Sequence, residues 1–151
     1  MIILWAILSF IIGSFVEWFA HRYVLHNFKF PSLSKYHFGR HHRNARQNNF
    51  IDNDYLDSPP KTWASGLHEV VGIGLILVAV LPFLLISVWL WIFLCVHAFG
   101  YYYLHRKSHL NPEWAKKWLP WHWRHHMGKN QNTNWGVTNP LFDYIFGTVS
   151  K

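Results

Sequence analysis

Histidine is the residue type in this sequence with the greatest capacity for chemistry. The chain of 151 residues contains 12 histidines, almost as many as its 14 lysines and arginines together. Imidazole is a neutral nitrogen ligand that suits iron, zinc, copper and nickel. Ten of the histidines fall in four clusters with the spacings H-x4-H, H-x3-HH, H-x3-H and H-x2-HH. The ten candidate metal ligands are His21, His26, His37, His41, His42, His105, His109, His122, His125 and His126.

The third and fourth clusters have the spacing of a single helix face. Residues three or four apart lie on one side of an α-helix. His105 can therefore share a face with His109. In the same way, His122 can meet both His125 and His126. Each of these clusters can present its imidazoles to a common point.

The first and second clusters contain pairs that an α-helix does not bring together. His37 and His41 are four apart and can share a face. His42 lies about 140° around a helix from His37, and His21 is offset from His26 by the same angle. These pairs need a helix end, a bend or two different ions. Because one ion rarely takes more than about six ligands, ten histidines predict two ions.

Lysine and arginine are missing from two long stretches, and these stretches indicate the elements that carry the histidines. Lysine and arginine are absent from residues 1–20 and 64–104, and only 14% of the chain is charged. Twenty helical residues cover about 30 Å, the thickness of a bilayer core. The second stretch is too long for one span, and Pro82 near its middle disfavours a continuous helix. The sequence therefore predicts an all-α integral membrane protein with three spans, at about 1–20, 66–81 and 83–104.

The last two spans predict a helical hairpin, which would place all four histidine clusters on one face of the membrane. One long tilted helix would instead separate them. Basic residues flank the spans on that face, so the positive-inside rule assigns it to the cytoplasm. This flank accounts for the net charge of +7, so we expect no nucleic-acid partner. Residues 1–20 lack the basic start and cleavage site of a signal peptide, so we expect a retained span.

The expected architecture is thus a single domain over residues 1–151, with a cytoplasmic histidine-rich helical cap on three transmembrane helices. The membrane would be a bacterial inner membrane or the endoplasmic reticulum. Five other polar residues have less defined roles. His68 and His97 are expected to be ordinary hydrogen-bonded side chains. Asp52, Asp54 and Asp57 form an acidic patch that is either solvated or a partner for histidine N–H groups.

Three sequence stretches add to the order of the histidine clusters. EWFAHRYVLH begins at Glu17, YLDSPP covers residues 55–60, and WGVTNPLFDYIFGT covers residues 135–148. Together they resemble the fatty acid hydroxylase superfamily, which contains fatty acid and sphingolipid hydroxylases, sterol desaturases and carotenoid hydroxylases. The second cluster departs from the pattern, since H-x3-HH is one residue longer than the usual H-x2-HH. The three spans are also fewer than the usual four.

The resemblance implies a non-haem di-iron oxygenase, with the ten clustered histidines holding two irons that zinc can replace in purified protein. The reaction would be hydroxylation of a lipid C–H bond with O2 and two electrons, on a fatty acyl or sphingolipid chain. A fused electron-donor domain has no room here, so the donor would be a separate ferredoxin or cytochrome b5-like protein. The alternatives are a sterol or carotenoid hydroxylase or desaturase of the same superfamily, and a non-catalytic membrane metal-binding protein.

Three polar residues near the C-terminus are candidates to orient ligand histidines through hydrogen bonds. These are Asn134, Asn139 and Asp143. Asn139 has a second interpretation, which we prefer: it caps a short helix that begins at Pro140.

Overall fold

The computed structural model describes residues 1–57 and 60–150, and these residues form helices and connecting loops with no strand. Three helical segments are long and apolar enough to cross a membrane. The predicted all-α architecture with three spans is therefore confirmed. The candidate spans are Ile2–Leu25, His68–Leu85 and Val88–Leu110.

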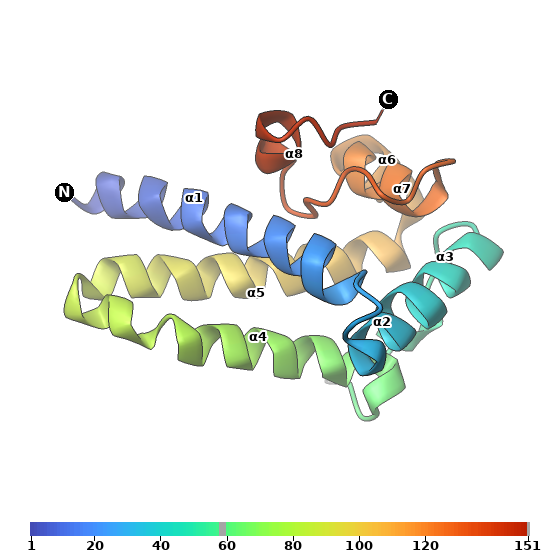
Figure 1. The fold of residues 1–151 in the computed structure, drawn as a ribbon, viewed down its shortest axis with the longest axis horizontal. Helices are drawn as coiled ribbons and strands as arrows, with labels where there is room; N and C mark the ends of the chain where they lie inside the picture. The colour runs from blue at the N-terminus through green and yellow to red at the C-terminus, as the bar shows by residue number, and fades with distance from the viewer. Residues whose placement is uncertain (58–59, 151) are drawn as a thin grey trace.

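The first span is the helix α1, Ile2–Ala20, which continues directly into the π-helical turn η1, His21–Leu25. It packs along the third span, α5, Val88–Leu110, which also contacts α4, His68–Ala79 (Figure 1). At one end of the bundle, Val80, Leu90 and Leu94 form an apolar cluster. These contacts hold the three spans together.

The predicted hairpin at Pro82 is present, but the two helices do not meet at the proline. Helix α4 ends at Ala79, and Pro82 lies in the 3-10 helix η5, Leu81–Leu85. A proline fits the first turn of a short helix because its missing N–H is not needed there. Helix α5 begins at Val88 and runs to Leu110, beyond the predicted end at residue 104. This extension carries His105 and His109 out of the apolar stretch on a continuous helix.

The remaining elements are short and gather around the end of the bundle away from the N-terminus and the hairpin turn (Figure 1). The cap that was predicted on one end of three spans is thus present. Which side of the membrane it faces stays a prediction. The elements are α2 (Pro31–Tyr36), η2 (His37–His42), α3 (Arg43–Gln47), η3 (Asn53–Tyr55), η4 (Trp63–Leu67), α6 (Pro112–Trp118), α7 (Pro120–Met127) and α8 (Leu141–Ile145).

The C-terminal segment returns over the first span and is fixed there by Glu17. The Glu17 carboxylate accepts hydrogen bonds from the backbone N–H groups of Val137 and Thr138 and from the Thr138 hydroxyl, at 2.7 Å for the last. Helix α8 contacts α1 next to this point (Figure 1). A charged residue in an apolar helix thereby positions the loop that follows α7, which supplies contacts to the histidines.

Candidate metal centre

Two π-helical turns bring together the histidine pairs that an α-helix would separate. In a π-helix the hydrogen bonds join residues five apart rather than four. The backbone N–H of His26 accordingly donates to the carbonyl of His21 at 3.2 Å, in η1. In η2 the rings of His37 and His42 lie 5.1 Å apart. The bend required by the sequence is therefore a π-helical turn, and this turn accommodates the extra residue of H-x3-HH.

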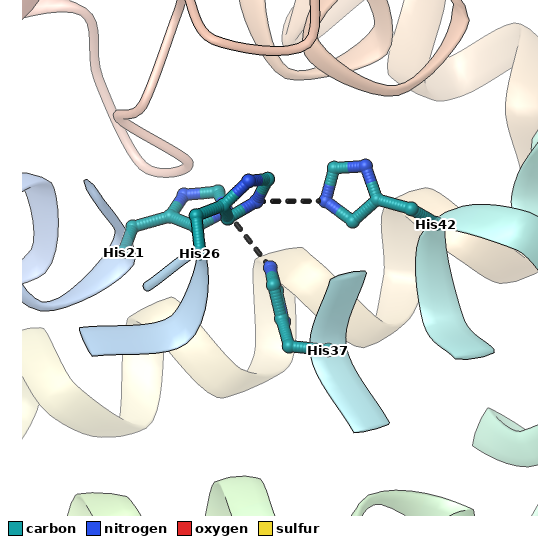
Figure 2. Close-up of side chains that lie close together, drawn as sticks. All are labelled: His21, His26, His37 and His42. Carbon is teal, nitrogen blue, oxygen red and sulfur yellow. Dashed lines mark hydrogen bonds between the residues drawn. The ribbon is translucent and has the colours of Figure 1, made fainter. Parts of the chain in front are cut away.

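The first histidine group consists of His21, His26, His37 and His42, whose nitrogens lie within 4.8 Å of one another. His37 Nε2 is 2.9 Å from His21 Nε2, and His26 Nε2 is 3.1 Å from His42 Nε2 (Figure 2). His125, from α7, adds a fifth nitrogen, since its Nε2 lies 3.3 Å from His26 Nε2. Figure 2 shows the four rings pointing toward a common space from η1 and η2.

The second histidine group consists of His41, His105, His109 and His126, whose nitrogens also lie within 4.8 Å of one another. These residues come from η2, α5 and α7, which are far apart in the sequence. His122 adds a fifth nitrogen, because its Nε2 is 3.1 Å from His109 Nε2. The arrangement has the donor set of a second metal site.

The two groups touch each other, and together they contain all ten predicted ligands. The rings of His42 and His126 stack with their centroids 4.0 Å apart, one from each group. His42 and His126 also form a third set of close nitrogens with His125. The structure therefore brings the ten histidines into one continuous cluster that can hold metal ions.

The division between the groups does not follow the helix-face pairs expected from spacing alone. His37 and His41 lie in different groups although they are four residues apart. His122 contacts the second group, whereas His125 contacts the first. Each group draws on several elements, so the position of each element in the fold decides which histidines meet.

Neutral oxygen and amide groups hold the rings of the first histidine group. Two are backbone carbonyls from the loop after α7, which Glu17 helps to fix. The hydrogen bonds run from His21 Nδ1 to the Trp135 carbonyl (2.6 Å), from His125 Nδ1 to the Thr133 carbonyl (2.7 Å), and between the Gln131 amide and His42 Nδ1 (3.0 Å).

Carboxylates hold two rings of the second histidine group. Tyr55 supports one of them, because its hydroxyl donates to Glu69 Oε2 at 2.8 Å. The ring contacts are His41 Nδ1 to Asp52 Oδ2 (2.7 Å), His105 Nδ1 to Glu69 Oε1 (2.7 Å) and His109 Nδ1 to the Phe50 carbonyl (2.9 Å). An Nδ1–H that donates to oxygen leaves the Nε2 lone pair free to bind a metal.

The ring nitrogens that face the centre of the second group fit a metal site. Buried polar atoms almost always have hydrogen-bond partners. Within residues 1–57 and 60–150, however, several buried imidazole nitrogens of this group have none. The Nε2 atoms of His41 and His105 and one nitrogen of His126 are those that metal ligation would use. The unpartnered atoms are His41 Nε2, His105 Nε2, His122 Nδ1, and both Nδ1 and Nε2 of His126.

Burial keeps the imidazoles of the cap in the neutral form that binds metals. Removal from water penalises the charged ring and lowers the pKa of His37 and His41 well below the ordinary value. Neighbouring histidines lower it further because protonated rings would repel one another. The same causes lower the pKa of His42, His122, His125 and His126.

The two carboxylates of the second histidine group were not predicted as site residues. Asp52 belonged to the acidic patch whose role the sequence left open, and the structure places it on His41. Asp54 instead pairs with Arg40, and Asp57 with Lys61. Glu69 carried a usable signal, since an acidic residue in an apolar span is costly and marks function.

The three predicted orienting residues make their hydrogen bonds elsewhere. Asp143 accepts the backbone N–H groups of Trp135 and Gly136, each at 2.8 Å, and so shapes the loop that presents the Trp135 carbonyl to His21. Asn134 bonds to the backbone of Ser150. Asn139 Oδ1 accepts the N–H of Leu141 at 3.1 Å, which agrees with the preferred capping role, although α8 begins at Leu141 and Pro140 takes its N-cap position.

An apolar cavity of about 290 Å³ lies between α1, α4 and α5 and reaches the first histidine group. His21, His37 and Glu69 line one end of it, and Gly13, Val80 and Leu94 line the other. The cavity thus connects the membrane-spanning part of the molecule with the candidate metal centre.

Of the predicted YLDSPP stretch, Tyr55 contacts the site through Glu69, whereas Ser58 and Pro59 lie outside the described residues.

The resemblance of the sequence to one protein family is tested by comparison with known proteins. The sequence model of the family described as "Fatty acid hydroxylase" matches residues 6–148, which is nearly the whole chain. Comparisons with curated proteins and with solved structures returned no match. With a match of this length added to the three spans and the histidine cluster, the chain belongs to the fatty acid hydroxylase family.

Proposed function

We propose that this protein is a membrane-bound non-haem di-iron oxygenase that hydroxylates a C–H bond of a fatty acyl or sphingolipid chain. The balanced reaction is R–H + O2 + 2 electrons + 2 protons giving R–OH + H2O. One observation carries the proposal: the first of two adjoining groups of converging imidazoles lies at the end of an apolar cavity between membrane spans. Family membership supports the class of reaction.

In this proposal the chain divides its ten histidines between two ions. The first histidine group with His125 holds one ion, and the second with His122 holds the other. Two bound irons would supply the activation of O2. The hydrogen bonds at Nδ1 fix the rings so that Nε2 faces the ion, as with Glu69 on His105. Burial of the rings excludes water from the reacting space.

The cavity would position the substrate. Its walls are apolar residues of three spans, which suit a hydrocarbon chain. His21 and His37 line the end of the cavity at the candidate metal centre. A chain that fills the cavity would therefore bring its C–H bonds to the metal-bearing end. Holding both reactants in place supplies much of the catalytic advantage of such a site.

The two electrons would come from a separate ferredoxin or cytochrome b5-like protein on the cytoplasmic side. The cap carries most of the basic residues, which favour an acidic partner. Arg46, for example, is exposed and donates to the His126 carbonyl at 2.8 Å, next to the second histidine group.

The test combines metal analysis with product analysis. Protein purified in detergent and loaded anaerobically with ferrous iron should bind about two irons per chain without a haem absorption band. Cells that express it should form a hydroxylated acyl or sphingolipid chain, with the new oxygen labelled by ¹⁸O2. The matched control is the double variant His125→Ala, His126→Ala, which should lose metal and product while keeping its helix content.

The outcomes separate the alternatives. A hydroxylated sterol or carotenoid would keep the chemistry and change the substrate class. An unchanged lipid profile from protein that retains two metals would favour a non-catalytic metal-binding protein. Failure to bind metal, or metal retained by the double variant, would overturn the site.

A further inference from the structure

His97 is a polar side chain inside the third span that the candidate metal centre does not use. It lies eight residues before His105 on α5, which is about 12 Å along the helix. Its Nε2 is 3.4 Å from Glu17 Oε2, within ion-pair distance, but this buried nitrogen has no hydrogen-bond partner in the described residues. The expectation that His97 is an ordinary hydrogen-bonded residue therefore does not account for it.

The fold provides a specific place for this imidazole. A Cβ atom at Gly13 would lie only 2.5 Å from His97 Cγ, so α1 needs a glycine there to let the ring approach. Glu17 Oε1 accepts the backbone N–H groups of Val137 and Thr138, and its Oε2 accepts the Thr138 hydroxyl and lies 3.4 Å from His97 Nε2. An ionisable side chain is expensive at membrane depth and is retained there mainly for function.

His97 lines the apolar cavity, and so does an exposed residue in the middle of a span. His97 and Tyr101 from α5, Val16 from α1 and Gly72 from α4 all line it. Leu75, also in the lining, is 66% exposed and lies about 10 Å from His68 along α4. The rim of the cavity therefore includes a residue in the middle of the span, where lipid chains surround the protein.

We propose that a single lipid chain enters this cavity sideways from the bilayer, and that His97 hydrogen-bonds a hydroxyl or carbonyl group part-way along it. The proposal rests on the proposed function for the reaction at the metal-bearing end. The substrate class in this proposal is an oxygenated lipid chain. Its polar group would lie at His97, about 12 Å along α5 from His105. Imidazole both donates and accepts, so it matches either group. A chain without the group leaves the nitrogen unpaired in apolar surroundings, which is the basis of selection.

The cavity is tested with two glycines of α4. A Cβ atom at Gly72 or at Gly74 would meet nothing within 4 Å, so a side chain can start at either position without a clash at Cβ. Only Gly72 lines the cavity. The probe is a saturated fatty acid with a diazirine near its methyl end, photolysed with metal-free protein in nanodiscs. We expect Gly72→Leu to reduce labelling of cavity residues at least tenfold and Gly74→Leu to leave it unchanged; equal labelling of both variants overturns the cavity.

The role of His97 is tested with a plain fatty acid and a positional series of its mid-chain hydroxy derivatives, competing with the diazirine probe. The wild type should prefer one hydroxy derivative over the plain acid by about tenfold, the scale of one buried hydrogen bond. His97→Leu should abolish this preference, and His97→Gln should preserve most of it. An equal loss of binding for both acids in His97→Leu would show that the residue only supports the fold, and would overturn the proposal.

These measurements need neither metal nor turnover, so they separate the two proposals. Labelling of the cavity without any hydroxylated product would count against the oxygenase and support the chain-binding site. Undiminished hydroxylation by Gly72→Leu would count against the chain-binding site and leave the oxygenase standing.

Discussion

The first and second histidine groups are alike in their imidazoles and differ in the groups that hold those imidazoles. Both are buried, although His26 of the first group is half-buried while all four residues of the second are buried. Carbonyls and an amide hold the first group. Asp52 and Glu69 hold two rings of the second. A carboxylate at Nδ1–H makes the opposite nitrogen a stronger ligand.

Ten identical side chains therefore need not make two equivalent sites. We expect the second group to bind its ion more tightly and to release it later. The carboxylates come from residues remote from the histidines, so the asymmetry is a property of the fold. The following predictions test it in order of decreasing effect.

The largest effect should come from removing one histidine from each group. In the wild type, a chelator should remove one equivalent of metal quickly and the second slowly. His26→Ala should lack the fast equivalent because it weakens the more accessible first group. His109→Ala should lack the slow one. Stopped-flow chelation with metal analysis measures both, and loss of both equivalents in each variant would mean that the groups act as one site.

Lowering the pH should reduce the free energy of unfolding through both groups alike, because buried neutral imidazoles occur in each. Burial lowers the pKa of His37 in the first group and of His41 in the second. Below the ordinary pKa near 6.5, the unfolded chain binds protons that the folded chain refuses. The stabilisation is therefore complete above about pH 6.5 and is lost as the pH falls.

The expected loss is about 1 kcal/mol per buried histidine for each pH unit below 6.5. Unfolding of the detergent-solubilised apoprotein at pH 7.5 and at pH 5.5 gives the measurement. A free energy of unfolding that does not change over this range would contradict the buried, neutral state of these rings.

Replacing the carboxylates should weaken one group selectively. Asp52→Asn or Glu69→Gln should lower the metal affinity of the second group by about 10- to 100-fold, because the ring loses a charged acceptor. The first group should change little. Asp54→Asn is the matched control, since Asp54 pairs with Arg40 and not with a histidine. Competition with a fluorescent chelator reports both affinities. A variant that weakens both groups equally would contradict the selective support of the second group by carboxylates.

The smallest effect should come from the amide of the first group. Gln131→Ala removes a hydrogen bond of 3.0 Å to His42 Nδ1. The amide N–H donates to Nδ1 and gives about 1 kcal/mol without making Nε2 a stronger ligand, so the affinity of the first group should change by no more than about fivefold. The same competition measures this, and an effect as large as that of Asp52→Asn would remove the distinction between neutral and charged support.

Several features of the site could be predicted from local sequence. The histidine clusters indicated metal binding, because so many imidazoles beside membrane spans need partners. Pro82 indicated the hairpin, and the hairpin placed the clusters at one end. The helix-face pairs, in contrast, predicted that His37 could meet His41, whereas the two residues lie in different groups. That prediction assumed α-helical geometry, whereas η2 is a π-helical turn.

The histidine donor set and the three membrane spans could be predicted from the sequence, because both depend on residue type and on spacing along one element. The packing of the elements decides which histidines come together and which oxygen atoms support them. Asp52 reaches His41 and Glu69 reaches His105 across separate elements. Such contacts depend on how the elements pack in three dimensions, and the spacing of residues along one helix does not contain that information.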